Sequence, residues 1–460
     1  MCHERRGEKR LTPAVSVSFL PIRSLLHRDS TPLFVYNFSF KTHRNKVDLF
    51  DRILKQAGPL GKYAAVAEGY YMFPQLEGEL GNRMKFRGKE VVCWSINNYL
   101  GLANHPEVRK ADAEGAARWG LAYPMGARMM SGETQLHQKL EQQLAHHVGK
   151  EAGLLVNYGY QGVLSAIDTL LTRHDVVVYD AESHACIVDA VRMHMGKRFA
   201  YQHNDIASLE KCLERAKRLT EGTEGGILVI TEGVFGMRGD QGKLREVCTL
   251  KEKYGFRLFI DDAHGFGMLG KTGAGTAEEQ GVTDDVDIYF STFAKSMALI
   301  GGFLAGNPEI IQYLKYNMRS QIFAKSLPMP LVEGLLKRFE LLRDRPQLRE
   351  KLWHNVRLLQ DGLQSRGFDI GDTNTCVTPV YMHGEVEEAM GLVKDMRDNY
   401  GVFCSLVAYP VIPKGMLILR LIPTAEHTEE DIQITLDAFT AVGEKLKSGV
   451  YKNYVPETIV

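Results

Sequence analysis

The sequence predicts an α/β protein with a mostly parallel sheet, followed by a second, smaller α+β unit. Between residues 153 and 306, short runs rich in Val, Ile and Leu alternate with amphipathic helical segments. Buried parallel strands separated by helices produce this alternation, because helices cover both faces of such a sheet. After Pro346 a long helical segment is followed by mixed strands and helices over about a hundred residues, which favours a small α+β domain.

The composition is that of an enzyme-sized folded chain. Its 460 residues are 44% hydrophobic and 24% charged, with 56 Lys and Arg against 56 Asp and Glu, so no charge excess points to nucleic acid. Seven cysteines without a C-x-x-C pair indicate reduced thiols and a cytoplasmic location. No apolar run approaches the ~20 residues of a transmembrane segment.

Five parts are expected along the chain. Residues 1–46 carry nine Lys or Arg against three Asp or Glu and are expected to be a disordered basic extension. A helix and hairpin segment (47–104) leads into a large domain (105–345), a small domain (346–446) and a tail (447–460). In the first segment, residues 47–69 predict two short helices, and 84–94 predict a hairpin that turns at Arg87-Gly88-Lys89.

Apolar periodicity gives the other elements. The expected strands of the large domain are 153–157, 175–180, 225–233, 256–261, 285–291 and 302–306, and its expected helices are 136–148, 161–171, 184–195, 206–219 and 243–254. The small domain is expected to hold helices 348–366 and 386–400, strands 376–382, 402–409 and 416–422, and a helix from Thr428 with Asp431 as its capping partner.

Polar residues follow several of the predicted strands. In parallel sheets the carboxyl ends of the strands meet at one edge, where ligands bind. The residues expected there are Asn157, Asp180 to His184, Thr231-Glu232, Asp261 and Thr292. Gly159 and Tyr160 open the next helix, whose free N–H groups suit a phosphate.

Lys295 follows an apolar strand and precedes small residues and Gly301-Gly302. A partly desolvated amine with room for a bulky aldehyde suits a Schiff-base site, although most such lysines are solvated. Asp261 and His264 strengthen the interpretation, because lysine, aspartate and histidine together are typical of a pyridoxal 5'-phosphate (PLP) site. The aspartate would keep the ring nitrogen protonated.

Residues 265–272, GFGMLGKT, also match a phosphate-binding loop. That loop leaves a strand directly and opens a helix, whereas here residues 261–264 intervene and the continuation is glycine-rich. We therefore do not favour a nucleotide site. The sequence contains no pair of residues at metal-ligand spacing, so no metal site is predicted. His137 is expected to be a packed or capping residue.

The chain resembles the α-oxoamine synthases, a family of PLP enzymes of fold type I, from about residue 47 to 446. The motifs that carry the resemblance are NNYLGL (97–102), GARMMSG (126–132), NYGYQG (157–162), DAESHACIVD (180–189), TEGVFGMRGD (231–240), DDAHGFGMLGKTG (261–273), STFAKS (291–296), GGF (301–303), FAKSLPMP (323–330) and LRLIPTAEHT (419–428). The family condenses a small amino acid with an acyl thioester and releases CO2.

The resemblance implies a role for each matched residue. Lys295 would bind the cofactor covalently and move protons, Asp261 would pair with the pyridine nitrogen, His264 would contact the phenolic oxygen, and His184 would stack on the ring. Gly159, Tyr160 and Thr292 would hold the phosphate, with Ser326 reaching it from the partner subunit of a homodimer. Arg420, Asn97 and Asn98 would bind the substrate carboxylate; from the sequence alone, an internal salt bridge of Arg420 is equally open.

Two departures from the family pattern concern the amino acid substrate. Gly236 stands where many members have serine, with Arg238 beside it, and Lys325 stands where a neutral residue is usual. Both cations suit the second anion of cysteate, and the alternative is that they face solvent. We expect an acyltransferase acting on cysteate or serine with a long-chain thioester of CoA or acyl carrier protein. The alternatives are glycine C-acetyltransferase, 8-amino-7-oxononanoate synthase, 5-aminolevulinate synthase and, in a different class, an aminotransferase.

Overall fold

The computed structural model describes residues 48–56 and 58–456. The chain divides into two compact units, 1–56 and 57–460, and each is described by itself. The described part of the first unit is the amphipathic helix α1 (Leu49–Gln56), whose residues are all exposed. The basic extension expected over 1–46 lies outside the described residues.

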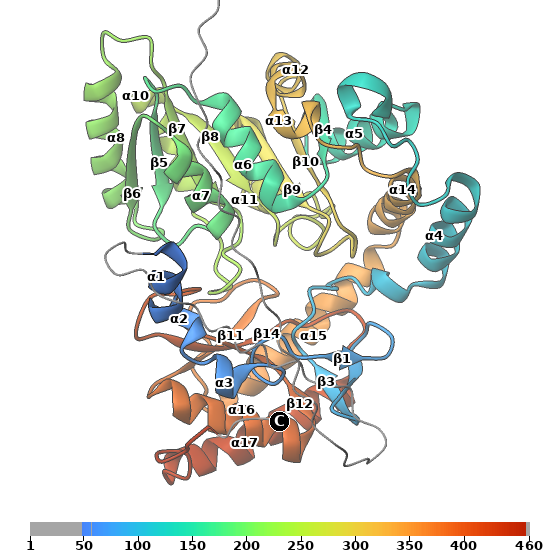
Figure 1. The fold of residues 1–460 in the computed structure, drawn as a ribbon, viewed down its shortest axis with the longest axis vertical. Coiled ribbons are helices and arrows are strands. Elements are labelled where there is room, and N and C mark those ends of the chain that lie inside the picture. Colours follow the sequence, from blue (N-terminus) through green and yellow to red (C-terminus); the bar gives the residue numbers. More distant parts are fainter. Residues whose placement is uncertain (1–47, 57, 457–460) are drawn as a thin grey trace, which may run out of the picture. The chain divides into compact units, whose positions relative to one another are not determined.

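A seven-stranded sheet forms the centre of the second unit, with strand order β4-β10-β9-β8-β7-β5-β6. The strands from β6 to β9 are parallel, while β10 runs antiparallel to both β9 and β4. The predicted mostly parallel α/β architecture is confirmed (Figure 1). The strands are β4 (Ala152–Val156), β5 (Val176–Asp180), β6 (Lys197–Tyr201), β7 (Ile227–Glu232), β8 (Arg257–Asp261), β9 (Ile288–Thr292) and β10 (Gly302–Gly306).

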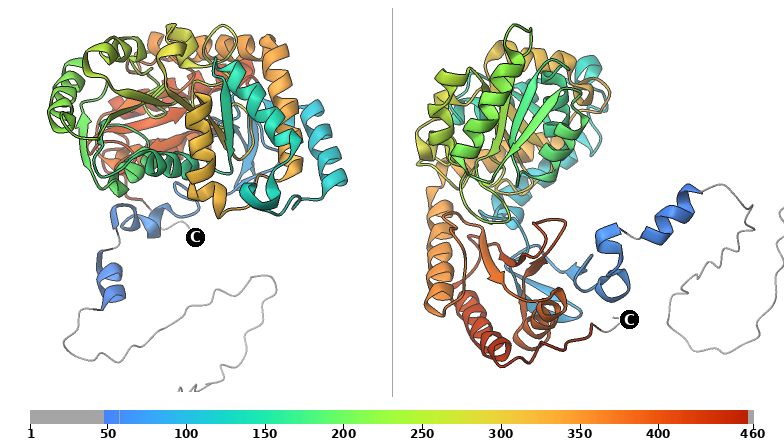
Figure 2. Two further views of the ribbon diagram at one scale, coloured as in Figure 1. Left: turned by 90° about the horizontal axis from the view of Figure 1, so that it is seen from above. Right: turned by 90° about the vertical axis from the view of Figure 1, so that its left-hand side faces the viewer.

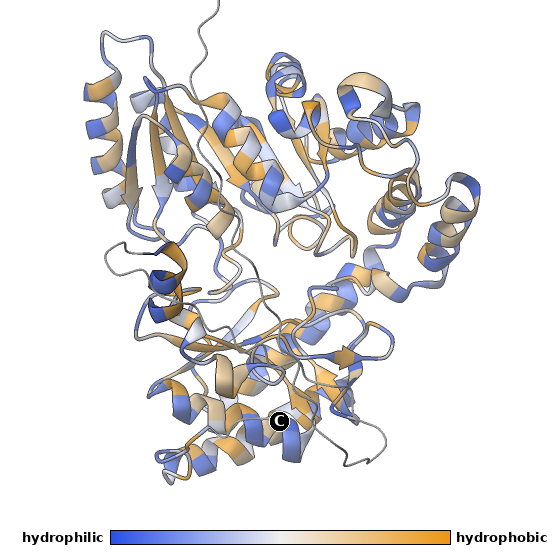
Figure 3. Cartoon of the chain, in the orientation of Figure 1, coloured by the Kyte–Doolittle hydropathy of each residue, from blue (hydrophilic) through white to orange (hydrophobic). Residues whose placement is uncertain are grey.

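Alternate residues of the strands pack into two separate hydrophobic cores, one on each face of the sheet. Val176, Val178 and Leu258 join one core with α5 and α8, whereas Val177, Ile230 and Phe259 join the other with α6 and α7. The strands other than β6 are accordingly mostly apolar, while the helices carry both polar and apolar residues (Figure 3). The helices of the large domain are α4 (Pro106–Trp119), α5 (Gln135–His147), α6 (Gly159–Leu170), α7 (Ala185–Met193), α8 (Ile206–Thr220), α9 (Leu244–Thr249), α10 (Lys251–Tyr254), α11 (Thr276–Gln280), α12 (Pro308–Asn317), α13 (Arg319–Ile322) and α14 (Met329–Asp344).

The early hairpin belongs to the small domain's core. Strands β2 (Arg83–Phe86) and β3 (Lys89–Cys93) turn at Arg87-Gly88, both with positive φ, which is the predicted hairpin. β3 then pairs in parallel with β12 (Val402–Phe403), and Trp94 is fully buried against helix α17 (Glu429–Lys447). The remaining elements are α2 (Gly58–Gly61), α3 (Ala64–Ala67), β1 (Leu76–Glu77), α15 (Pro346–Ser365), β11 (Thr378–Met382), α16 (Val386–Tyr400), β13 (Ser405–Val407) and β14 (Leu417–Leu421).

Some elements differ from the prediction. The expected helix 243–254 is divided into α9 and α10, and the expected strand 402–409 into β12 and β13, which pair in different sheets. β6 was missed because it is a sheet edge with a mostly exposed, polar pattern. Further views are given in Figure 2. Among the described helices, none is long and apolar enough to cross a membrane.

Candidate active site

The carboxyl ends of β7, β8 and β9 bring several predicted residues together. Glu232 of β7 is in register with Asp261 of β8, and Asp261 with Phe290 of β9, two residues before Thr292. These ends lie at one edge of the sheet because the strands are parallel. The turn after β9 then carries Lys295.

Lys295 lies half-buried in a tight turn that closes through bonds from Phe293 N–H to Gly301 O (2.9 Å) and from Ala298 N–H to Lys295 O (3.0 Å). Burial lowers the pKa of its ammonium to about 8, although the carboxylates of Asp261 and Glu232 act in the opposite direction. An appreciable fraction is therefore a neutral amine near pH 8, which is the nucleophilic form.

Asp261 is 5% exposed and accepts hydrogen bonds from Ala263 N–H (3.1 Å) and, more weakly, from the Cys186 thiol (3.9 Å). Burial raises the pKa of the Asp261 carboxyl, while Lys295 and His184 oppose this. No Lys, Arg or His of the described residues forms an ion pair with Asp261. A buried carboxylate of this kind is suited to a cationic partner such as a protonated ring nitrogen.

His264 is held between two neighbours. Its Nδ1 shares a hydrogen bond with the hydroxyl of Tyr99 (2.8 Å), and a Cβ at Gly236 would stand 2.2 Å from its Nε2. Burial, with Lys295 and Arg420 adding to it, lowers the pKa of His264 well below the ordinary value. The ring is therefore neutral, so that one of its nitrogens carries a proton and can donate a hydrogen bond.

His184 is the N-cap residue of α7, and its Nδ1 accepts a hydrogen bond from Cys186 N–H (3.3 Å). Tyr160 stands edge-on to its ring at 6.2 Å between centroids, and the Tyr160 hydroxyl donates to Asp189. Gly159, which opens α6, packs directly on Thr292: a Cβ there would be 2.9 Å from Thr292 Oγ1. The start of α6 thus packs closely on the end of β9, and a helix N-terminus at this place is suited to a phosphate.

The described contacts of Ser326 are with a different part of the chain. Its N–H donates to Gly126 O (2.8 Å), and its buried hydroxyl has no hydrogen-bond partner among the described residues. No described contact joins Ser326 to Lys295 or Thr292. An orphaned buried hydroxyl on this loop is consistent with the predicted function of Ser326 in a partner's site, which remains a prediction.

Arg420 of β14 is 9% exposed, and its Nε donates to Gly236 O (2.7 Å), with Asn97 Oδ1 at 3.5 Å from its NH2. No carboxylate of the described residues lies within ion-pair distance of this guanidinium. Burial lowers its pKa, since nearby Tyr99 and Cys376 compensate only in part. Of the two alternatives left open by the sequence, the internal salt bridge is therefore not formed within residues 48–56 and 58–456, which leaves the guanidinium free for an anion such as a substrate carboxylate.

Asn98 makes two hydrogen bonds inside the protein, and the substrate contact expected for it remains a prediction. Its Nδ2 donates to Glu426 Oε2 (2.9 Å), and its Oδ1 accepts from Ala103 N–H (3.1 Å). Its amide therefore holds the turn that follows β3, with one of its two N–H groups and its oxygen used inside the protein. The two adjacent amides thus differ, with Asn97 beside Arg420 and Asn98 in the scaffold.

The two extra cations also differ. Arg238 makes two hydrogen bonds to Glu182, one of them 2.7 Å from its NH2 to Oε1, so its charge is already paired. Lys325 is exposed, and its carbonyl accepts a hydrogen bond from the Asn157 amide. Among the described residues, Arg238 forms an ion pair with a carboxylate, whereas Lys325 does not.

These residues fit PLP. The site offers a lysine of lowered pKa, a buried carboxylate without a cation, a neutral histidine and a glycine-lined helix start at one sheet edge. Together with the mostly parallel sheet, this set defines a PLP-dependent enzyme of fold type I.

The glycine-rich run after Asp261 serves a different purpose from a nucleotide loop. The carboxylate of Asp262 is fully buried and accepts from Thr276 N–H (2.7 Å), Thr276 Oγ1 (2.6 Å) and Tyr289 OH (2.9 Å). A Cβ at Gly265 or Gly275 would stand about 2 Å from its oxygens, at 2.1 and 2.0 Å. The glycines therefore make room for Asp262, and helix α11 begins only at Thr276.

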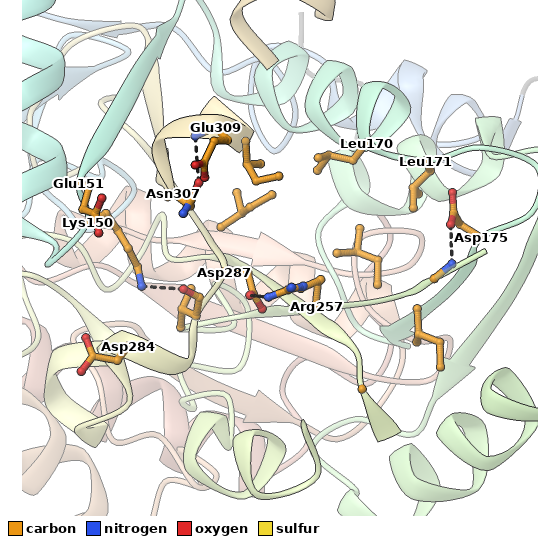
Figure 4. A pocket seen from close by; sticks show the side chains of 18 of the residues that line it. Lys150, Glu151, Leu170, Leu171, Asp175, Arg257, Asp284, Asp287, Asn307 and Glu309 are labelled. Atoms are coloured by element: carbon orange, nitrogen blue, oxygen red, sulfur yellow. Dashed lines mark hydrogen bonds and ion pairs between the residues drawn. The ribbon is translucent and has the colours of Figure 1, made fainter. Parts of the chain in front are cut away.

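A cavity of about 730 Å³ lies elsewhere, at the opposite ends of the strands (Figure 4). Two of its charged groups are bound within the protein: the Lys150 ammonium donates to Val286 O (2.6 Å), and Asp287 accepts from Lys251 and Arg257. It shares no lining residue with the site at Lys295.

Comparison with known proteins agrees with the geometry. Residues 89–439 match the family model "Aminotransferase class I and II". The chain is 63% identical over 405 residues to the cysteate-C-fatty acyltransferase of Capnocytophaga ochracea, covering 88% of this chain and 96% of that protein. It is 36% identical over 378 residues to the 8-amino-7-oxononanoate synthase of Thermoanaerobacter pseudethanolicus, covering 82% and 94%. A serine palmitoyltransferase structure from S. paucimobilis with bound PLP has a TM-score of 0.80 and 28% identity, covering 87% of this chain and 100% of that one.

The chain belongs to the aminotransferase class I and II family, and within it to the α-oxoamine synthases, which are PLP-dependent acyltransferases.

Sequence reasoning assigned no function to Tyr99, Cys186 or Gly236, which contact the predicted residues. Tyr99 lies next to Asn98 within the NNYLGL motif, so the motif could have indicated that Tyr99 belongs to the site. The contact of Gly236 with His264 joins two different strand ends, and only the folded chain reveals it.

Proposed function

We propose that this protein transfers a fatty acyl group from a thioester to cysteate, with loss of the cysteate carboxylate as CO2. The observation that carries the proposal is the 63% identity to a cysteate-C-fatty acyltransferase over nearly all of that protein's length. In the overall reaction, a bond forms between the cysteate Cα and the acyl carbonyl carbon. The thioester bond and the bond from Cα to the carboxylate break, and a proton completes the free thiol.

When bound, PLP draws electrons from the amino acid Cα and stabilises the carbanion that attacks the acyl carbonyl. The protein's own residues would hold and orient the reactants. Asp261 would hold the positive charge of the ring nitrogen, while neutral His264 would donate a hydrogen bond to the phenolic oxygen. Gly159 and Tyr160 at the start of α6, with Thr292, would hold the phosphate, and the His184 ring would stack on the cofactor.

Nζ of Lys295 would remove and return the proton at the amino acid Cα. Its pKa of about 8 lies close to working pH, where a group serves as both base and acid. Arg420, with Asn97 beside it, would bind the substrate carboxylate bidentately and fix which Cα bond is broken.

Cysteate brings a second anion, the sulfonate, which serine lacks. An unpaired charge in a closed site costs several kcal/mol, so a cysteate enzyme needs a further cation. Lys325 is the candidate that the ion-pair network leaves unpaired, whereas Arg238 is neutralised by Glu182. We therefore assign the sulfonate contact to Lys325, supplied in the homodimer.

The deciding experiment measures CO2 and free thiol from a long-chain acyl thioester with glycine, alanine, serine and cysteate. The proposal expects cysteate to react fastest, and Lys325→Ala to abolish that preference while sparing serine. Lys211→Ala, which removes an exposed lysine of α8, is the matched control. Glycine with acetyl-CoA as the fastest pair would overturn the proposal.

A homodimer is supported by apolar side chains exposed around Ser326. Leu121 is 77% exposed, Met130 77% and Phe323 74%, and such a cluster favours burial by a second copy. Sedimentation should give a dimer, and a fully active monomer would contradict it. The six described cysteines are free thiols, which supports a cytoplasmic location.

A further inference from the structure

Glu232 is a buried carboxyl beside the cofactor site, and the resemblance assigns it no function. It ends β7 in register with Asp261 of β8, so the two side chains leave neighbouring strands on the same face. Each residue is 5% exposed. Two carboxyl groups therefore lie side by side, away from water.

One oxygen of Glu232 has a defined partner. Oε1 accepts a hydrogen bond from the backbone N–H of His184, the N-cap residue of α7. This N–H precedes the helix and has no intrahelical partner. Glu232 therefore fixes the backbone position from which the His184 ring extends.

Negative groups predominate around this carboxyl. Burial raises the pKa of Glu232 well above its ordinary value and Asp261 raises it further, while the hydrogen bond from the His184 N–H and the charge of Lys295 only partly oppose this. For Asp261, by contrast, Lys295 and His184 counter the effect of burial. The ionisable groups that act on Glu232 are Asp180 of β5, Cys186 at the start of α7, Tyr201 of β6, Asp261 of β8 and Lys295 after β9.

We propose that Glu232 is a positioning residue that works as a neutral carboxylic acid: it holds the His184 backbone and leaves the single negative charge of the carboxyl pair on Asp261. Among the described residues, Lys295 is the one cation that would balance a second negative charge here. A neutral acid keeps the acceptor oxygen that His184 needs without adding that charge. The inference rests on the proposed cofactor site, but it holds for any amino acid substrate.

The first test is the pH dependence of unfolding of the full-length holoenzyme, wild type against Glu232→Gln, which mimics the neutral acid. A carboxyl whose pKa is raised on folding contributes stability that is present at low pH and lost as pH rises above its unfolded pKa. Glutamine has no such loss. The melting temperature of Glu232→Gln should therefore rise relative to wild type between pH 5 and pH 8. A variant that falls further below wild type as pH rises would overturn the proposal, because Glu232 would then be a stabilising anion.

Glu141→Gln is the matched control. Glu141 is another buried glutamate, 6% exposed, but it accepts two hydrogen bonds from Arg128 (2.8 and 3.0 Å). Its replacement should lower the melting temperature at pH 8, where that ion pair is formed. Substrate preference does not enter either measurement, so a wrong amino acid assignment leaves this test unaffected.

The second test separates positioning from folding by cofactor affinity and turnover. Glu232→Gln should keep the PLP dissociation constant and kcat within about twofold of wild type, since its amide oxygen can accept the His184 N–H. Glu232→Leu, of similar size, should weaken PLP binding by about tenfold, as a lost buried hydrogen bond does. Equal losses in both variants would overturn the neutral-acid function. If Glu232→Leu does not fold, the pH series of Glu232→Gln decides.

Discussion

Gly236 and His264 are in such close contact that no side chain fits between them: a Cβ at Gly236 would stand 2.2 Å from Nε2 of His264. The carbonyl of the same glycine accepts a hydrogen bond from Nε of Arg420 at 2.7 Å. The loop after β7 thus contacts one side chain of the large domain and one of the small domain. Both belong to the proposed site, so its geometry depends on this glycine.

Replacing Gly236 by serine, the residue of many family members, should displace His264. We expect a loss of about 1–3 kcal/mol in unfolding free energy, typical of overpacking, together with weaker PLP binding. The measurements are urea unfolding and cofactor titration. Gly226→Ala is the control, because the nearest atom to a Cβ there is Asp175 Oδ1 at 3.7 Å. Wild-type behaviour of Gly236→Ser would show that His264 can move freely.

Arg420→Met should lower kcat/KM for the amino acid by roughly 30-fold or more, the effect of about 2 kcal/mol or more of lost charge pairing. The unfolding free energy should change by only about 1 kcal/mol, since no carboxylate is left behind. The buried Arg128, which pairs with Glu133 and Glu141, is the contrast: Arg128→Met should cost about 3–5 kcal/mol. A large stability loss in Arg420→Met would reveal an anion that we have not identified.

His203 bridges two carboxylates, Asp180 at 3.1 Å and Asp240 at 2.9 Å. Burial lowers its pKa, but the two aspartates raise it more, to about 9. A histidine with a raised pKa contributes stability that is fully present below its unfolded pKa and is lost as pH rises through 9. His203→Gln should therefore be less stable than wild type by about 2–3 kcal/mol at pH 6, and the gap should close by pH 10.

The control is His137→Gln, because burial lowers the pKa of His137 to about 4 and leaves it neutral throughout this range. Its deficit should grow from pH 6 to pH 10, the opposite trend, because at pH 6 only the unfolded chain binds a proton on His137. Urea unfolding across this pH series distinguishes the two histidines. A constant gap for His203→Gln would mean that His203 is uncharged.

A further prediction concerns Lys295. Capture of PLP by the apoprotein should speed up as pH rises through about 8, since the neutral amine is the reactive form. Borohydride should then fix the cofactor covalently on Lys295, as peptide mapping would show. Lys295→Ala should lose turnover by several orders of magnitude. A colourless protein that binds ATP at Lys271 would refute the PLP assignment.

Periodicity and motifs predicted the central sheet and the residues at its carboxyl edge, because apolar runs and the residues that end them are local features. The bond of Asn98 to Glu426, by contrast, spans 328 positions and has no local signal in the sequence. The same holds for the pairing of Arg238 with Glu182 and for the register of Glu232 with Asp261. These depend on which strands and loops become neighbours, which only the tertiary fold determines.

The parallel pairing of β3 with β12 has a consequence for synthesis. Trp94 is completely buried, and its backbone N–H donates to Phe403 O (2.8 Å), a residue made 309 positions later (403 minus 94). At about 5–20 residues per second the ribosome takes roughly 15–60 s to reach it. For that time Val91, Val92 and Trp94 have left the ribosome without the strand that covers them. The hairpin of β2 and β3 therefore emerges early but can complete its pairing only late in synthesis. During this time its apolar residues would be exposed to chaperones.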